Sequence, residues 1–372
     1  MVSSTAGAIA AQRSARVMVV DDSAIVRGLI SRHLGAAPGI EVVGTAANGE
    51  IALRELHRHP VDVVILDLEM PVMDGMTALP RILAEHPKTR VIIASTLSLR
   101  NAEISLRALQ LGASDYVPKP EGGLASAESF HDELVMKIRA LTGVSERRAE
   151  ARPPPAARPA PAPAAATPAP AVAAVRGPRL KPTVLAIGAS TGGPSALTRF
   201  FESIRGAIHQ PILLTQHMPA TFTSLLAEQL SRAGQRPCSE ARDGEPLRQG
   251  HCYVAPGGWH MVVAREGAMP VIRLNQEPPE NFCRPAVDPM LRSVAAYYGP
   301  SALAIIFTGM GSDGAKGCQA IAQAGGRFIV QDEASSVVWG MPGAAAATGL
   351  AEAVLPLEQI GPWARRIAGA PE

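Results

Sequence analysis

Three residues of types that together cleave esters or amides are spread over the C-terminal half of the sequence. Ser190, His217 and Asp313 each come just after a short apolar run. A serine can attack a carbonyl carbon when a histidine takes its proton and an aspartate orients the imidazole ring. Their order along the chain is Ser–His–Asp, whereas α/β-hydrolases have the order Ser–Asp–His. This order predicts a different fold that carries the same acyl-transfer chemistry.

The serine lies in a local sequence that is typical of a nucleophile. Residues 188–192 read Gly-Ala-Ser-Thr-Gly and fit Gly-x-Ser-x-Gly, in which the serine occupies a sharp turn between a strand and a helix. Free N–H groups at the start of that helix could stabilise an oxyanion, with Thr191 as the candidate residue. A plain helix cap or a nucleotide-binding turn would also fit so short a motif. Phosphate binding is disfavoured because neither Gly-x-Gly-x-x-Gly nor Gly-Lys-Ser/Thr occurs there.

The histidine and the aspartate each have an ordinary interpretation as well. A histidine after a strand is usually a hydrogen-bonded polar residue, and an aspartate in Gly-Ser-Asp-Gly is most often a turn residue. The occurrence of serine, histidine and aspartate just after strands of one sheet favours a catalytic triad over these separate explanations. We do not expect the other histidines to be the base, because they lack the strand-end position or fall in an expected hairpin: His209, His251 and His260.

A second group of residues, in the N-terminal third, predicts a phosphorylation site. Asp21 and Asp22 follow the first apolar run, and Asp67 ends the third. The carboxyl ends of parallel strands share one edge of a sheet, so these carboxylates are expected to gather and repel one another there. A Mg²⁺ ion would relieve the repulsion, and a carboxylate could then attack phosphorus to form an aspartyl phosphate. Asp21 and Asp22 could instead simply cap the following helix.

Two further positions complete this acidic group. Ser95 or Thr96 ends the fourth apolar run, where a hydroxyl can bond a phosphoryl oxygen, and both are candidates. Lys119 follows the fifth run, where its ammonium can pair with phosphate. The Lys119–Pro120 bond is a candidate for the cis isomer. Helix capping alone does not account for acidic, hydroxyl and basic residues at successive strand ends.

These two groups require parallel sheets that bring strand ends to a common edge. In both halves of the sequence, apolar runs alternate with helical patterns, which predicts doubly wound α/β folds with helices on both faces of the sheet. Residues 250–263 in the second half are expected to add an antiparallel β-hairpin. The apolar runs are Arg16–Val20, Ile40–Gly44, Val61–Leu66, Val91–Ala94, Tyr116–Val117, Thr183–Ile187, Ile212–Leu214 and Ala302–Phe307.

A proline- and alanine-rich segment separates the two halves of this 372-residue chain. Residues 142–181 contain nine prolines, cannot build a core, and are expected to form an extended spacer. The predicted organisation is a disordered tail, a first domain, the spacer and a second domain. These parts are residues 1–15, 16–141, 142–181 and 182–372.

Charge, hydropathy and cysteine usage exclude several classes of function. Both predicted domains are nearly neutral and only the spacer is basic, so no nucleic-acid partner is expected. No apolar run approaches the roughly 20 residues of a membrane span, and the N-terminus does not resemble a signal peptide. The cysteines form no CxxC pair and are expected to be reduced thiols of a cytoplasmic protein, without a metal in the second domain. They are Cys238, Cys252, Cys283 and Cys318.

The N-terminal motifs resemble the receiver domains of two-component signalling over about residues 16–140. The resemblance implies a flavodoxin-like sheet with strand order 2-1-3-4-5, and Asp67 as the phosphoacceptor. It also implies Mg²⁺ held by Asp21, Asp22 and Asp67, and phosphate sensing by Lys119 with Ser95 or Thr96. The matching segments are Val-Asp21-Asp22-Ser, Leu-Asp67-Leu-Glu-Met-Pro-Val-Met-Asp-Gly and Gly-Ala-Ser-Asp-Tyr-Val-Pro-Lys119-Pro.

The C-terminal motifs resemble the catalytic domain of the protein-glutamate methylesterases over roughly residues 183–365. One loop departs from the usual His-Arg-Pro-Ser-Val-Asp, because Cys283 precedes Arg284 and Ala286 replaces the serine. The triad residues are present, so only substrate contacts near that loop are expected to differ. The matching segments are Gly-Ala-Ser190-Thr-Gly-Gly, Thr-Gln-His217-Met-Pro, Tyr-Val-Ala-Pro-Gly257, Arg284-Pro-Ala-Val-Asp288, Thr-Gly-Met-Gly-Ser-Asp313-Gly and Glu333-Ala-Ser-Ser-Val-Val-Trp-Gly-Met-Pro342.

Together the two resemblances imply a phosphorylation-activated serine hydrolase of chemotaxis-type signalling. They imply hydrolysis of glutamate γ-methyl esters, and deamidation of certain glutamines, on methyl-accepting chemoreceptors. A chemotaxis histidine kinase would be the phosphodonor, and the enzyme would be cytoplasmic, near receptor arrays. A DNA-binding response regulator is disfavoured, because the second domain is near neutral and has no helix-turn-helix pattern. A non-catalytic, phosphorylation-dependent adaptor is the alternative, although an adaptor would tolerate a broken triad.

Overall fold

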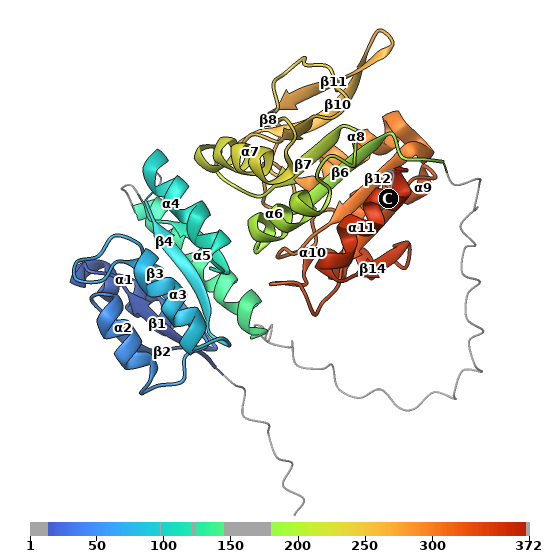
Figure 1. Ribbon diagram of the computed structural model, residues 1–372. Coiled ribbons are helices and arrows are strands. Elements are labelled where there is room, and N and C mark those ends of the chain that lie inside the picture. Colours follow the sequence, from blue (N-terminus) through green and yellow to red (C-terminus); the bar gives the residue numbers. More distant parts are fainter. Residues whose placement is uncertain (1–13, 97, 121–123, 145–179, 370–372) are drawn as a thin grey trace, which may run out of the picture.

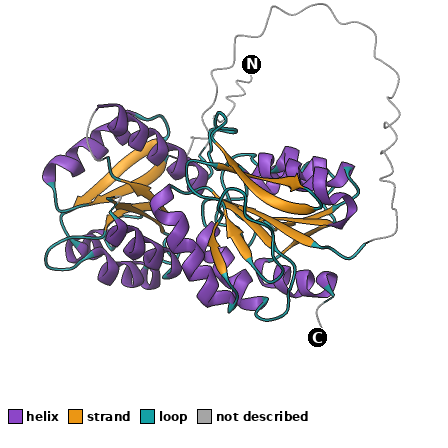
Figure 2. Ribbon diagram, turned by 90° about the horizontal axis from the view of Figure 1, so that it is seen from above, coloured by secondary structure: helices purple, strands orange, loops and turns teal. Residues whose placement is uncertain are grey.

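The computed structural model describes residues 14–96, 98–120, 124–144 and 180–369, which form two α/β units (Figure 1). Most of the predicted tail and of the predicted proline-rich spacer lies outside these ranges. Figure 2 shows each unit as a sheet covered by helices on both of its faces. Within the described residues, no helix is both long enough and apolar enough to cross a bilayer.

The N-terminal unit is a five-stranded parallel sheet in the order β2-β1-β3-β4-β5. This confirms the predicted strand order. Polar side chains cap the helices that follow the strands: Ser23 accepts a hydrogen bond from the N–H of Val26, and Asp74 accepts one from Thr77. The strands are β1 (Ala15–Val20), β2 (Ile40–Ala46), β3 (Val63–Asp67), β4 (Arg90–Ser95) and β5 (Asp115–Pro118), and the helices are α1 (Ala24–Ala36), α2 (Gly49–Leu56), α3 (Gly75–Glu85), α4 (Leu99–Gln110) and α5 (Leu124–Thr142).

The C-terminal unit is a seven-stranded parallel sheet in the order β14-β13-β12-β6-β7-β9-β8, with a separate antiparallel pair β10-β11. This confirms the predicted α/β class with an antiparallel addition. Its strands are β6 (Val184–Ala189), β7 (Ile212–Gln216), β8 (Cys238–Glu240), β9 (Cys252–Val254), β10 (His260–Glu266), β11 (Met269–Asn275), β12 (Ala302–Ile306), β13 (Arg327–Gln331) and β14 (Ala353–Leu355). Its helices are α6 (Gly193–Ser203), α7 (Ala220–Gly234), α8 (Val287–Tyr298), α9 (Ala315–Gln323), α10 (Met341–Ala346) and α11 (Leu357–Ala368), with a short 3-10 helix at Gly299–Ser301.

Alternation along the central strand β6 explains why helices cover both faces of this sheet. All six β6 residues are buried, and successive side chains point to opposite faces. Leu185 and Ile187 pack in one core with α6, α7 and α11. Val184 and Ala186 pack in the other core with α8, α9 and α10. A strand that is apolar on both faces is therefore fixed at the centre of the domain.

The hairpin was predicted at the wrong residues. Residues 252–254 form β9, which pairs in parallel with β7 and β8, whereas the antiparallel pair is formed by β10 and β11. The Pro-Gly-Gly sequence that suggested a tight turn serves a close contact instead. A Cβ at Gly257 would lie 2.2 Å from the backbone nitrogen of Ala220, so only glycine fits against the start of α7.

The prediction of a cis Lys119–Pro120 bond is also wrong. Among the described residues, the cis peptide bond is Arg284–Pro285.

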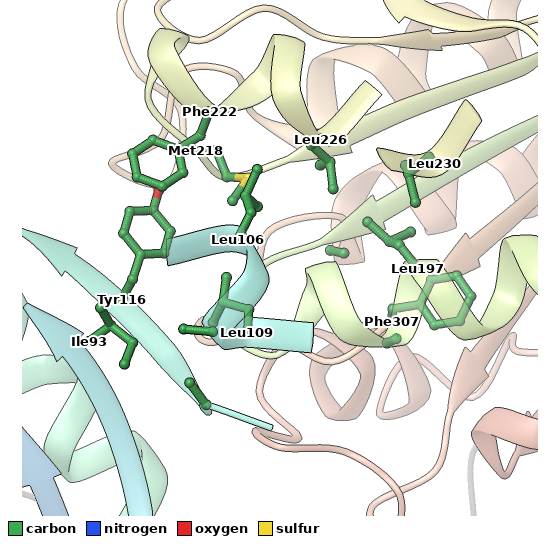
Figure 3. Close-up of a cluster of buried hydrophobic side chains, with 14 of the residues drawn as sticks. Ile93, Leu106, Leu109, Tyr116, Leu197, Met218, Phe222, Leu226, Leu230 and Phe307 are labelled. Carbon is green, nitrogen blue, oxygen red and sulfur yellow. The ribbon is translucent and has the colours of Figure 1, made fainter. Parts of the chain in front are cut away.

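The two units pack directly against each other through an apolar cluster. Figure 3 shows Leu106, Leu109 and Tyr116 of the N-terminal unit meeting side chains from α6 and α7. The Tyr116 and Phe222 rings stack with centroids 4.3 Å apart. Helix α4 contacts both α6 and α7, and the Ser195 hydroxyl donates a hydrogen bond to the Leu109 carbonyl at 2.6 Å. The face formed by α4 and β5 is therefore buried against the C-terminal unit.

Candidate active site and phosphorylation site

The sheet topology brings the three predicted catalytic residues to one edge. Ser190 follows β6, His217 follows β7 and Asp313 lies in the loop after β12. These strands are neighbours in the order β12-β6-β7, and all run in the same direction. Because residues beyond the carboxyl ends of adjacent parallel strands lie close together, the three side chains share one site.

Asp313 is fixed in position to orient the histidine. His217 Nε2 donates to Asp313 Oδ2 at 2.8 Å. The Asp313 carboxylate also accepts backbone N–H groups of Val287 at 2.6 Å and Asp288 at 3.0 Å, and the Asn281 side chain at 2.8 Å. Burial alone would raise the pKa of Asp313, but the hydrogen bond from His217 and these further bonds lower it. The aspartate therefore stays ionised beside the imidazole.

The second ring nitrogen of His217 faces a cysteine. Cys283 Sγ lies 3.4 Å from His217 Nδ1, on the side of the ring away from Asp313. Burial lowers the pKa of His217, but the hydrogen bond to Asp313 and the contact with Cys283 outweigh it and raise that pKa to about 9. Since Nε2 is bound to Asp313, Nδ1 is the nitrogen left to accept a proton from Ser190. Cys283 therefore contacts the ring nitrogen that would act as the base in the predicted triad.

Ser190 is held by its backbone at a tight turn. Its N–H donates to the Thr308 carbonyl at 3.0 Å, and its carbonyl accepts from Gln216 Nε2 at 2.9 Å. Gly192 closes the turn with a φ of 77°, a conformation that favours glycine. A Cβ at Gly309 would lie 2.8 Å from the Ser190 Cβ, so that glycine leaves room for the serine. Within the described part of the chain, the Ser190 hydroxyl has no hydrogen-bond partner.

The N-terminal unit reaches the residue beside Ser190. Thr191 Oγ1 donates to Asp115 Oδ2 at 2.6 Å, and both residues are buried. Asp115 also forms an ion pair with Lys137 at 3.2 Å. Burial lowers the pKa of Lys137, but Asp115 and Glu133 outweigh it and raise that pKa, so the lysine is charged. The side chain of Thr191, the predicted oxyanion residue, is thus bound to the other unit.

A cavity of about 310 Å³ lies between the two units in front of His217. Tyr116, Glu133 and Lys137 line it from the N-terminal unit. His217, Cys283 and Arg284 are among the residues that line it from the C-terminal unit. The space next to His217 is therefore bounded by both units.

The predicted acidic pocket is assembled at the carboxyl edge of the N-terminal sheet. Oxygen atoms of Asp21, Asp22 and Asp67 lie within 4.8 Å of one another. Lys119 Nζ lies 2.7 Å from Asp21 Oδ2 and 2.9 Å from Asp67 Oδ2. Burial raises the pKa of Asp67 despite the opposing effect of Lys119. Three clustered carboxylates are a donor set that fits a hard divalent ion such as Mg²⁺.

The two hydroxyl candidates differ in their surroundings. Ser95 is buried at the end of β4, whereas Thr96 is exposed. The Thr96 Oγ1 accepts from Asn101 Nδ2 at 2.6 Å, and the same amide group lies 3.4 Å from Glu69 Oε2. Among the described residues, Thr96 and not Ser95 therefore belongs to a side-chain hydrogen-bond network that leads from the strand end to α4.

Sequence reasoning missed several residues of the two sites. Asn281 binds both Asp313 and Asp288, yet it lies in an irregular loop without periodicity. The sequence motif presents Gln216 only as the neighbour of His217. Asp115 was seen only as part of a receiver-like motif, and its bond to Thr191 depends on how the two units pack. The spacing of residues within either unit carries no signal for that contact.

Comparison with known proteins finds a family match for each unit. A family model described as CheB methylesterase matches residues 185–363, and one described as response regulator receiver domain matches residues 17–125. The protein-glutamate methylesterase/protein-glutamine glutaminase 1 of Paramagnetospirillum magneticum is 54% identical over 369 residues, which cover 95% of this chain and 96% of the relative. The protein-glutamate methylesterase/protein-glutamine glutaminase of Azospirillum brasilense is 52% identical over 376 residues, covering 95% and 92%.

A solved structure matches the C-terminal unit. The crystal structure of the Thermotoga maritima CheB methylesterase catalytic domain is 34% identical, with a TM-score of 0.49, and covers 50% of this chain and 100% of that one.

Fold and sites together define a response regulator, in which a receiver domain is joined to an output domain with a Ser–His–Asp cluster. Near full-length identity above 50% then decides the family. The chain belongs to the protein-glutamate methylesterase/protein-glutamine glutaminase family.

Proposed function

We propose that the C-terminal domain hydrolyses glutamate γ-methyl esters, and deamidates glutamines, on chemoreceptors. One observation carries the proposal: Ser190, His217 and Asp313 lie at adjacent strand ends, with His217 hydrogen-bonded to Asp313 at 2.8 Å. The names of the relatives, protein-glutamate methylesterase/protein-glutamine glutaminase, supply the substrate class.

The reaction proceeds through an acyl-enzyme. The Ser190 hydroxyl gives its proton to His217 Nδ1 while its oxygen bonds to the side-chain carbonyl carbon of the receptor glutamyl ester. The protonated histidine then returns the proton to the leaving oxygen, so methanol departs; with glutamine, ammonia departs. Water attacks the acyl-serine by the same route and releases the glutamate carboxylate. N–H groups at the turn of Ser190, including that of Thr191, stabilise the negative oxygen.

The receiver domain accepts its phosphoryl group on Asp67 from a histidine kinase. Asp21, Asp22 and Asp67 would hold Mg²⁺, which neutralises charge on the incoming phosphoryl group. Lys119 already contacts Asp67 and would pair with a phosphoryl oxygen. Ser95 or Thr96 supplies the hydroxyl, and the bond between Thr96 and Asn101 favours Thr96 as the one that reports to α4. We assign no metal or cofactor to the catalytic domain.

Phosphorylation regulates the hydrolase by loosening the packed receiver. The unphosphorylated receiver holds Thr191 through Asp115 and bounds the cavity in front of His217. A phosphoryl group on Asp67 would draw the hydroxyl residue and Lys119 inward and shift the α4-β5 face. Because that face is buried against α6 and α7, its shift weakens the contact and opens the site to a receptor helix.

The partners and the place of action follow from this function. The substrate is the methylated segment of a chemoreceptor, so the enzyme works in the cytoplasm beside receptor arrays. No nucleic acid and no insertion into the membrane enter the mechanism.

Methanol release from a methylated receptor tests the proposal. The full-length protein should release methanol slowly, and faster when a small phosphodonor and Mg²⁺ are added. Absence of methanol release by both the full-length protein and residues 182–372 would leave only the adaptor alternative.

A further inference from the structure

The C-terminal ends of two receiver helices meet at a cluster of two histidines and a glutamate, away from both sites described above. His57 caps α2, and Glu85 and His86 end α3. One ligand atom from each residue lies within 4.8 Å of the other two. We propose that His57, Glu85 and His86 form a binding site for a borderline transition-metal ion, of which Zn²⁺ is the representative.

A hydrogen bond to the backbone sets the tautomer of the His57 ring. Its Nδ1–H donates to the Leu53 carbonyl at 2.8 Å. In the neutral ring, Nε2 must then carry the lone pair, as it does in most metal-binding histidines whose other nitrogen is bound to a carbonyl. That Nε2 lies 3.5 Å from Glu85 Oε2, so two acceptor atoms face each other. Only a proton or a metal cation makes such a contact favourable.

The second histidine adds an independent observation. Its Nε2 is shielded from solvent and has no hydrogen-bond partner among the described residues. A buried ring nitrogen without a partner is costly unless something binds it. The rings of His57 and His86 lie with centroids 5.1 Å apart and nearly perpendicular, so they do not block each other by stacking.

The charges around the cluster favour a cation of this class. Both histidines cap helix C-termini, where the carbonyl groups carry partial negative charge. Arg81 is a positive group beside the cluster, with its Nε 3.7 Å from Glu85 Oε1. The other carboxylate oxygen, Oε2, faces His57. Two imidazoles and one carboxylate suit Zn²⁺ better than Mg²⁺, because imidazole is a ligand of borderline metals and Mg²⁺ prefers oxygen. Water would complete the coordination of this partly exposed ion.

A bound ion would tie the end of α2 to the end of α3. The acidic pocket lies near the other end of α3, because a Cβ at Gly75, the first residue of α3, would lie 2.1 Å from the carbonyl oxygen of Asp67. The proposed site is thus separate from the Mg²⁺ site. We expect metal binding there to affect the stability of the receiver domain.

Calorimetric titration of the full-length protein with Zn²⁺ tests the site, in buffer with excess Mg²⁺ to fill the acidic pocket. The wild type should bind one more equivalent than His57→Ala/His86→Ala, or bind it at least about tenfold more tightly. His59→Ala is the matched control, because His59 is an exposed histidine two residues from His57 and outside the cluster. The thiols are the same in all three proteins, so they cancel in the comparison.

Thermal unfolding gives a second readout that does not depend on enzyme activity. Zn²⁺ should raise the unfolding temperature of the wild type and of His59→Ala, and raise that of the double variant less. Equal stoichiometry and equal affinity in all three proteins would overturn the proposal.

Discussion

At the scale of single residues, the proposed mechanism uses the hydroxyl of a serine that is held in place by its backbone. Ser190 is placed by the bonds of its N–H and carbonyl groups, while its own hydroxyl is left for the reaction. Removal of that hydroxyl should therefore change chemistry without changing structure.

We expect Ser190→Ala to lower methanol release by about 10⁴-fold or more, because the triad members act as a unit. Circular dichroism and the unfolding temperature should match those of the wild type. A variant that folds normally and retains near-normal turnover would show that Ser190 is not the nucleophile.

The contact between Cys283 and His217 predicts a pH effect. Burial lowers the pKa of His217, but Asp313 and Cys283 raise it to about 9, so at neutral pH the ring is mostly protonated and unable to act as a base. The rate should rise as pH increases toward that value. Cys283→Ala removes one of the groups that raise the pKa, so the midpoint of the pH–rate profile should move to lower pH.

This is tested by measuring the pH–rate profile of the fragment 182–372 with and without Cys283→Ala. Cys238→Ala is the control, because it also removes one half-buried thiol. Identical midpoints in Cys283→Ala and the parent fragment would show that the thiol does not affect the histidine. A profile that is flat from pH 5 to pH 8, with chemistry rate-limiting, would argue against a histidine base altogether.

At the scale of elements, the aromatic stack between β5 and α7 links the two domains. The rings of Tyr116 and Phe222 lie 4.3 Å apart, and Tyr116 comes from the receiver. Tyr116→Ala should weaken the packing and raise the activity of the unphosphorylated protein, while the catalytic domain keeps its sequence. Tyr116→Phe keeps the ring and should keep the low activity. Equal activity of both variants and the wild type would mean that this stack does not restrain the enzyme.

The elements that carry the sites could largely be predicted from the sequence. Short apolar runs, each followed within three residues by a polar side chain, place Asp67, Ser190 and His217 at strand ends, because such runs are typical of buried parallel strands. The β9 strand was mistaken for half of a hairpin, since its three residues become a strand only by pairing with β7 and β8. Asn281 and Cys283 could not be predicted as neighbours of the triad, because an irregular loop carries them there.

At the scale of the whole molecule, the receiver is placed to restrain the hydrolase. Residues 182–372 alone should turn over faster than the unphosphorylated full-length protein, because Thr191 and the cavity at His217 are then free of the receiver. A phosphodonor with Mg²⁺ should speed the full-length protein and leave Asp67→Ala unchanged. Equal rates for the fragment and the unphosphorylated protein would exclude inhibition, and the receiver would then act by stimulation or by localisation.

The contact between the domains is largely hydrocarbon, and this makes the restraint a function of temperature. Separation exposes Leu106, Leu109 and Phe222 to water, so opening is accompanied by a positive change in heat capacity. Hydrophobic association weakens on cooling. The ratio of unphosphorylated full-length activity to fragment activity should therefore rise as the assay is cooled from 30 °C to 5 °C. A ratio that stays constant would show that hydrophobic association does not govern the restraint, and the enzyme of a cold cell would be as tightly restrained as that of a warm one.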